Sequence, residues 1–176
     1  MTEEITVELR RLINLDRISR SDKPYSIKTT EGEREALAQR FGLVAIHTLS
    51  ASYTISPSSN SRKGYMVLGS LSAKVVQSCI RTLVDVPEKI DIKFSILVVD
   101  QKHETLNPFD PEHDEDYEYS AEGEIDLGEV TAQYLSLNLN PFPQKTSSEL
   151  SKSSVENAPT QTKKNPFAVL ETLKSS

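Results

Sequence analysis

The chain has 176 residues, of which 36% are hydrophobic and 26% are charged, and its formal net charge is −6. This length and apolar content suffice for one domain with a sizeable core, and not for two. The first residues, Met1 to Glu4, are acidic, and no apolar run approaches the roughly 20 residues of a membrane helix. We therefore expect a cytoplasmic protein without a membrane partner.

The negative charge is concentrated in one short stretch. Residues 110–129 carry ten acidic side chains and no Lys or Arg. Residues 1–109 carry 15 basic and 13 acidic side chains, a net of +2, and residues 130–176 carry five basic and three acidic, again +2. Because phosphates repel carboxylates, this distribution argues against a protein that coats nucleic acid uniformly.

The N-terminal third predicts two short strands and a helix. Alternating apolar and basic residues over Leu9–Ile18 indicate a strand that leads into a turn, and Tyr25–Thr29 indicates a second strand. Thr30 and Glu33 have the capping-box spacing, and Gly42 is placed to end the helix in the left-handed conformation.

Three longer strands are expected next. Leu43–Ile55 and Tyr65–Cys79 place apolar residues on alternate positions, and Ile90–Val98 repeats the pattern. A polar loop over residues 57–63 separates the first two, so we expect an antiparallel hairpin that the third strand extends into a meander. Pairing Ile55 with Tyr65 would place His47 opposite Ala73.

The last part of the chain predicts a loop, a helix and a tail. Residues 101–124 contain Pro breaks and the acidic run, which is typical of an exposed mobile loop. Asp126 is placed to cap a helix, with Glu129 at the capping-box position. One helix face would hold Leu127, Val130, Tyr134 and Leu137, and Pro141 and Pro143 would end the helix.

The predicted fold class is therefore α+β, with an antiparallel β-meander sheet packed against two main helices. The predicted domain spans residues 1–143. Residues 144–164 are rich in Ser, Thr and Lys and predict a disordered linker. Residues 165–174 predict a short C-terminal helix with Phe167, Leu170 and Leu173 on one face, which would either dock on the domain or bind a partner.

No pattern in the sequence indicates catalysis or a cofactor. Cys79 and His47 are the only conceivable nucleophile and base, and the expected register separates them by roughly 20 Å. The run Asp114, Glu115 and Asp116 lacks the spacing of an EF-hand, and the six glycines form no phosphate-binding loop. We expect a protein that is not an enzyme and has no metal, cofactor or small-molecule substrate.

A basic cluster near the N-terminus is a candidate contact for RNA phosphate. Six cations fall within nineteen residues, opposed only by Asp16 and Asp22. Ordinary solvated strand surfaces carry similar charge, and this simpler interpretation is preferred. The candidate RNA contacts are Arg10, Arg11, Arg17 and Arg20.

Two segments carry a resemblance to a known family. Residues 73–87 read Ala-Lys-Val-Val-Gln-Ser-Cys-Ile-Arg-Thr-Leu-Val-Asp-Val-Pro, and residues 125–130 read Ile-Asp-Leu-Gly-Glu-Val. In this order they resemble the YceD family of bacterial large ribosomal RNA subunit accumulation proteins. Many members have a second cysteine where this chain has Thr82. The motif residues Cys79, Thr82, Asp126, Leu127 and Gly128 are therefore expected to be structural.

The resemblance implies a non-enzymatic role in the production of large-subunit (23S) ribosomal RNA. Either the protein binds a ribosomal protein or assembly factor, or it binds precursor RNA directly. The acidic stretch favours the first, because it would attract lysine-rich proteins and repel RNA. The candidate protein-binding residues are Asp114, Glu115, Asp116, Glu118, Asp126 and Glu129.

Overall fold

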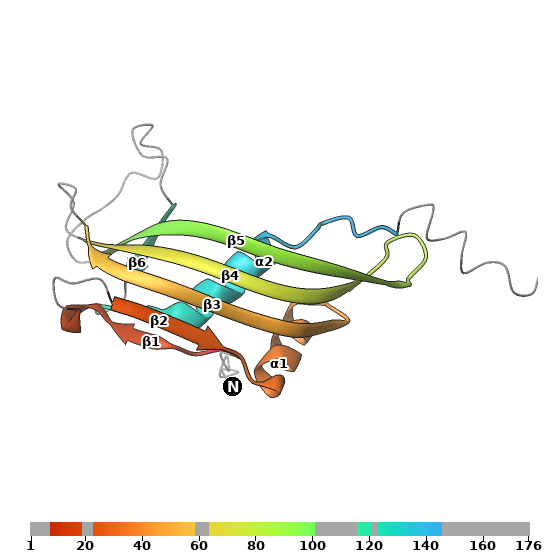
Figure 1. Cartoon of the computed structure of the whole chain (residues 1–176), viewed down its shortest axis with the longest axis horizontal. Helices are drawn as coiled ribbons and strands as arrows, with labels where there is room; N and C mark the ends of the chain where they lie inside the picture. The colour runs from red at the N-terminus through yellow and green to blue at the C-terminus, as the bar shows by residue number, and fades with distance from the viewer. Residues whose placement is uncertain (1–7, 19–22, 59–63, 101–115, 121–122, 146–176) are drawn as a thin grey trace, which may run out of the picture. The chain divides into compact units, whose positions relative to one another are not determined.

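A five-stranded sheet with one helix across its face forms the centre of the fold (Figure 1). The computed structural model describes residues 8–18, 23–58, 64–100, 116–120 and 123–145. The sheet order is β2 (Lys23–Lys28), β3 (Ala45–Pro57), β4 (Gly64–Ser78), β5 (Asp85–Asp100) and β6 (Asp116–Ser120). Strands β2 to β5 are antiparallel neighbours, which confirms the predicted meander.

The prediction of a continuous loop over residues 101–124 was wrong, because this range contains strand β6. Residues 116–120 form β6, which pairs in parallel with the end of β5, so that Glu118 lies opposite Val98. Residues 101–115 lie outside the described part of the chain. Strand β7 (Glu124–Asp126) pairs with β1 (Leu12–Asn14) in a separate two-stranded ladder. Within Leu9–Ile18, the segment expected to form a strand that leads into a turn, residues 12–14 form the strand and a 3₁₀ turn, Leu15–Arg17, follows.

Helix α1 (Glu31–Phe41) begins and ends where its sequence predicts. Thr30 accepts a hydrogen bond from the Glu33 N–H (3.3 Å), and the Glu33 carboxylate accepts one from the Thr30 N–H (2.8 Å). Gly42 has a φ of +65°, a conformation that a residue with Cβ adopts at a cost. The helix therefore has a capping box at one end and a left-handed glycine at the other.

Helix α2 (Leu127–Leu137) lies across the core face of the sheet (Figure 1). The expected apolar face was partly wrong, because Leu137 is 77% exposed. The buried face is centred near Thr131, and at 3.6 residues per turn Leu137 lies about 120° around the helix from it. The buried residues of α2 are Leu127, Gly128, Val130, Thr131, Ala132 and Leu135.

The main core lies between α2 and alternate residues of the sheet. Tyr53, Ile55, Val67, Leu71 and Val98 are each at most 2% exposed. The expected register of the hairpin was wrong by two residues, because Tyr65 pairs with Pro57. A shift of two preserves which side chains face the core, whereas a shift of one would reverse every side chain. The expected tail beyond Lys145, with its linker and short helix, lies outside the described residues.

Candidate protein-binding groove

The N-terminus of α2 is fixed by Asp126. Its carboxylate accepts hydrogen bonds from the backbone N–H groups of Gly128 (2.9 Å) and Glu129 (3.4 Å), and it also accepts one from the backbone N–H of Arg11 (2.7 Å). The Leu127 N–H in turn donates to the Arg11 carbonyl (3.0 Å). One acidic side chain thus joins the start of the helix to a segment more than 100 residues earlier.

Gly128 permits this contact. A Cβ added at Gly128 would lie 2.0 Å from the carbonyl oxygen of Leu9, a distance that no side chain tolerates. Leu9 and Leu127 are each 1% exposed. The sequence Asp126-Leu127-Gly128 therefore supplies a cap, a core side chain and a close backbone approach, which are all structural functions.

Aromatic residues hold the middle of α2 against the sheet. Tyr53 and Thr131 share a hydrogen bond between their hydroxyls (2.7 Å), and the rings of Phe94 and Tyr134 stack with centroids 3.7 Å apart. Burial raises the pKa of Tyr53 to about 12. Gly69 leaves room for Phe94, because a Cβ there would lie 2.4 Å from the ring. These contacts fix the position of α2 against the sheet.

A surface hollow of about 440 Å³ lies between β6, β7 and α2. We call it the acidic groove, because four of its lining side chains are carboxylates and Arg10 is the only cation among its lining residues. Its other lining residues include Leu12, Tyr119, Ile125, Val130 and Gln133. The four carboxylates are Glu118, Glu124, Asp126 and Glu129.

Two of these carboxylates already have partners. Asp126 caps the helix, and Glu129 accepts hydrogen bonds from Arg40 at 2.7 and 3.0 Å. Arg40 also pairs with Glu8 (3.1 Å), and its hydrogen bonds lower the pKa of Glu129. The prediction that Glu129 would close a capping box was wrong, because its side chain turns to Arg40 and leaves the helix end to Asp126.

Glu118, unlike Asp126 and Glu129, neither caps a helix nor forms an ion pair within the described residues. It is half-buried, and burial followed by the charge of Glu129 raises its pKa. Among the described residues, no Lys or Arg forms an ion pair with it. Partial burial and the nearby charge of Glu129 both raise the free energy of the ionised Glu118 side chain. A cationic side chain from a binding partner would lower that free energy.

Of the six residues predicted to bind a protein partner, three line the acidic groove, namely Glu118, Asp126 and Glu129. Asp116 accepts a hydrogen bond from the Tyr134 hydroxyl (2.8 Å) and lies beside the groove, while Asp114 and Glu115 lie outside the described residues. The groove also contains Glu124, which the sequence analysis missed because its place depends on the pairing of β7 with β1.

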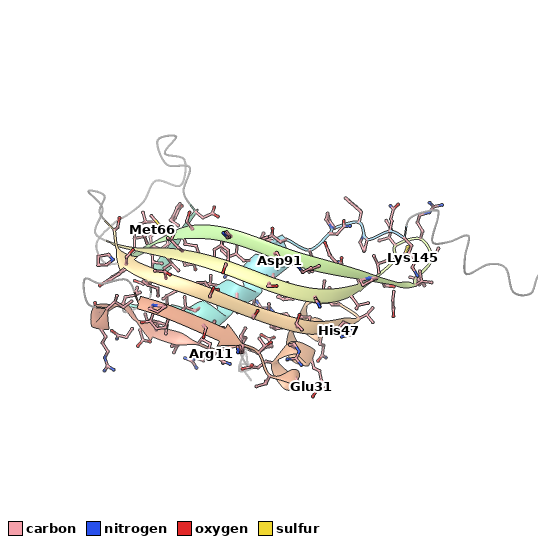
Figure 2. All side chains as sticks on the ribbon, viewed as in Figure 1. Arg11, Glu31, His47, Met66, Asp91 and Lys145 are labelled. Atoms are coloured by element: carbon pink, nitrogen blue, oxygen red, sulfur yellow. The ribbon has the colours of Figure 1, made fainter. Side chains whose placement is uncertain are left out.

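The arginines predicted to contact RNA have different surroundings in the described part of the chain. Arg11 donates to Glu33 (2.7 Å), and Arg10 lines the acidic groove. Arg17 is exposed at the end of the 3₁₀ turn, and Arg20 lies outside the described residues. Arg11, labelled in Figure 2, lies directly before β1.

Comparison with known families identifies the chain. The family model described as "Large ribosomal RNA subunit accumulation protein YceD" matches residues 67–174. The chain belongs to the YceD family. No curated protein and no solved structure gives a significant match. The family name indicates a role in the accumulation of large-subunit ribosomal RNA.

The matched region contains β4 from residue 67 onward, β5, β6, β7, α2 and most of the acidic groove, and it leaves β1 to β3 and α1 before it. The YceD motif around Cys79 forms the turn between β4 and β5. Cys79 is 1% exposed, its N–H donates to the Val84 carbonyl (2.8 Å), and its carbonyl accepts from the Leu83 N–H (2.9 Å). Leu83 has a φ of +58°, and Thr82 is exposed in the turn.

His47 lies in a β-bulge of β3, where the register shifts between Ile46 and Thr48. His47 is exposed, on the side of β3 toward α1 (Figure 2). It lines a hollow of about 490 Å³ with Glu31, Arg34 and Glu35, and Cys79 does not line that hollow.

Among the described residues, no three His, Cys, Asp or Glu side chains are arranged to hold a metal ion. Neither described α-helix, each of 11 residues, is long enough to cross a membrane.

Proposed function

We propose that this protein is a non-enzymatic factor for the accumulation of large-subunit ribosomal RNA that binds a basic ribosomal protein or assembly factor in its acidic groove. The observation that carries the proposal is Glu118, a half-buried carboxylate with a raised pKa and no ion pair among the described residues. A lysine or arginine side chain of a partner would supply the missing cation.

The chemistry of the groove suits a basic side chain. Charge-assisted hydrogen bonds from Lys or Arg to a carboxylate are among the strongest polar contacts, and they strengthen where water is partly excluded. Glu118 and Glu124 are the groove carboxylates that the described structure does not use in a cap or an ion pair. These two side chains are the proposed contacts.

The preceding sequence would assist the encounter. Asp110, Glu112, Asp114 and Glu115 add four carboxylates directly before β6. Charge of one sign near a binding site raises the rate of association with an oppositely charged partner, and salt weakens the effect as the Debye length falls from about 10 Å at 0.1 M.

Direct binding of precursor RNA by the N-terminal arginines is the alternative. Two observations weigh against it: Arg11 is bonded to Glu33, and Arg10 lies among the groove carboxylates. Phosphate placed there would meet uncompensated negative charge.

The test compares three double variants of the full chain. Glu118→Gln with Glu124→Gln removes the groove charge, while Glu31→Gln with Glu35→Gln removes the same charge from exposed positions on α1. In cells that lack the native gene, we expect the groove variant alone to lose co-purification of basic ribosomal proteins, co-sedimentation with large-subunit precursors, and large-subunit RNA. Full activity of the groove variant would contradict the proposal. The proposal would also be wrong if the third variant, Arg10→Ala with Arg17→Ala, were the one that lost co-purification, co-sedimentation and large-subunit RNA.

A further inference from the structure

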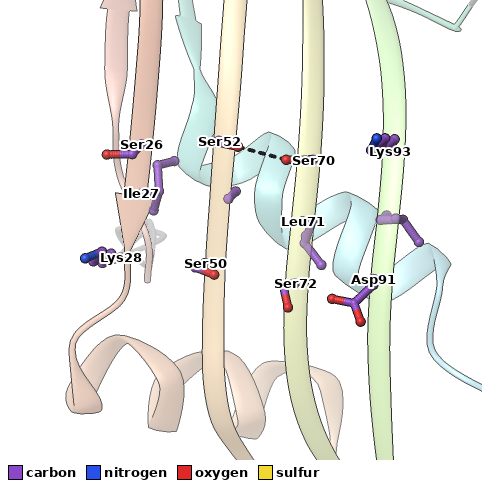
Figure 3. Close-up of a pocket in the computed structure, with 12 residues that line it drawn as sticks. Ser26, Ile27, Lys28, Ser50, Ser52, Ser70, Leu71, Ser72, Asp91 and Lys93 are labelled. Carbon is purple, nitrogen blue, oxygen red and sulfur yellow. Dashed lines mark hydrogen bonds between the residues drawn. The ribbon is translucent and has the colours of Figure 1, made fainter.

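The outer face of the sheet, opposite α2, carries a second feature that the acidic groove does not explain. Its middle is formed by serines and lysines from β2 to β5, and we call it the serine–lysine face (Figure 3). Its exposed or half-exposed residues are Ser26, Lys28, Ser50, Ser52, Ser70, Ser72, Lys74, Lys89, Asp91 and Lys93.

The register aligns these side chains in rows across the strands. Lys28, Ser50, Ser72 and Asp91 are successive partners, and so are Ser26, Ser52, Ser70 and Lys93. The next row toward the β4–β5 turn contains Thr48, Lys74 and Lys89. Alternation along each strand places every member of these rows on one face, because the other positions are in the core.

The rows enclose a shallow hollow. Serine side chains are short, whereas Lys28 and Lys93 at the two sides are long, and a volume of about 660 Å³ lies between them. The first and last of the four strands are separated by three inter-strand spacings, on the order of 14 Å. The Ser52 and Ser70 hydroxyls lie 2.8 Å apart and face outward (Figure 3).

The charge of this face is positive. Lys28, Lys74, Lys89 and Lys93 are opposed by Asp91 alone among the rows described above. Hydrogen bonds from Lys89 and Ser72 hold the pKa of Asp91 below its usual value, so this carboxylate is already occupied. The remaining lysines are exposed and available.

We propose that the serine–lysine face binds the phosphate backbone of RNA. Lysine and serine side chains are common donors to phosphate oxygens, and a flat row of hydroxyls between cations offers several donors to one strand. The rows contain no aromatic side chain on which a base could stack, so contacts to the backbone and not to bases are expected. Binding is therefore independent of sequence and sensitive to salt.

The acidic groove does not oppose this binding. Glu118 pairs with Val98, whose side chain belongs to the core, so the groove opens on the α2 side of the sheet. RNA on one face and a basic protein on the other would not compete. The inference is independent of the proposed function, and each has its own variant.

The test measures RNA binding by the purified full chain. The triple variant Lys28→Ala, Lys74→Ala and Lys93→Ala is compared with the native chain by fluorescence anisotropy, on a 20-nucleotide single-stranded RNA and on a 20-base-pair RNA duplex. We expect the triple variant to bind about tenfold more weakly at 0.1 M salt, and the slope of log K against log salt to fall by about 2 for the single strand.

Three controls make the result specific. The matched Lys→Arg variant retains the charge and should bind as the native chain does. Arg10→Ala with Arg17→Ala should also retain binding, as should Glu118→Gln with Glu124→Gln. The triple lysine variant should unfold at the same temperature as the native chain, because the three lysines are exposed, and this equality excludes loss of folding as the cause of weaker binding.

Other results would overturn the proposal. Unchanged RNA affinity of the triple lysine variant would show that this face does not bind RNA. Displacement of RNA by poly-L-glutamate at an equal concentration of charge would show a surface for acidic proteins. Both proposals are supported if the triple lysine variant loses RNA affinity and the Glu118→Gln, Glu124→Gln variant loses co-purification of basic proteins. Because the two readouts are measured on different variants, each proposal can fail without the other.

Discussion

The acidic groove and the serine–lysine face carry opposite charges, and they differ most in how far the fold uses those charges. In the groove, Asp126 caps α2 and Glu129 is held by Arg40, so two of four carboxylates contribute to the structure. On the sheet face the lysines are exposed, and the one acidic residue is paired with its neighbour.

Stability and binding can therefore be separated. Asp126 and Glu129 bond to residues from distant parts of the chain, so removal of either charge disturbs folding as well as partner binding. Charges on the sheet face project from strands that the core already holds, and exposed substitutions there change stability by less than about 0.5 kcal/mol.

Gly128→Ala should be the most damaging single change beside the groove. Its Cβ would lie 2.0 Å from the Leu9 carbonyl oxygen, so the N-terminal segment must move away from α2. We expect a loss of about 3 kcal/mol or more in the free energy of unfolding, measured with urea. Gly32→Ala in α1 is the control, because a Cβ there has no neighbour within 4 Å, and it should not destabilise the protein. Equal stability of the two variants would contradict the close approach.

Cys79→Ser tests a site that belongs to neither region. The thiol is 1% exposed, and a hydroxyl buried in its place should lower the free energy of unfolding by about 1 to 2 kcal/mol. Large-subunit RNA accumulation and RNA affinity should not change, because the thiol is buried and is part of neither proposed binding surface. Loss of function in a folded Cys79→Ser protein would show a chemical role for the thiol.

Arg40→Gln removes the cation that holds Glu129 and Glu8. Because these side chains are about one third exposed, the expected loss at pH 7 is at most about 1 kcal/mol. The pKa of Glu129 is lowered in the folded state, so its stabilising effect is present above its unfolded pKa and is lost as pH falls through the folded value. The difference from the native chain should therefore shrink in acid. A difference independent of pH would assign the effect to packing.

Glu118→Gln should have the smallest effect and the opposite sign. The pKa of Glu118 is raised in the folded state, so its ionised form destabilises the protein above that pKa, and the penalty disappears as pH falls below the unfolded value of about 4.3. At pH 7 the variant should unfold at a temperature no more than a few degrees higher. Lys93→Ala should leave it unchanged. A Glu118→Gln variant less stable than the native chain would mean that this carboxylate has a partner in the folded state.

Local patterns predicted the parts of the fold that depend on neighbouring residues. The period of two in residues 43–55, 65–79 and 90–98 predicted three antiparallel strands, and Thr30, Glu33 and Gly42 predicted both ends of α1. Asp126 was predicted as a cap for the same reason, since the two N–H groups that it caps lie two and three residues ahead, whereas its hydrogen bond from Arg11 was not foreseen. The family could also be recognised, because its motifs are contiguous.

The tertiary structure alone decided the pairings between distant segments. Strand β6 was not predicted, because the acidic composition of residues 116–120 is typical of a loop. These residues form a strand by pairing in parallel with β5, and that pairing cannot be read from their own sequence. Glu129 left the predicted capping box because Arg40, 89 residues away, offers two hydrogen bonds. The serine–lysine face was not foreseen, since its rows depend on the register of four strands at once. A sequence determines which residues can cap a helix or alternate in a strand, and long-range packing determines which charges meet.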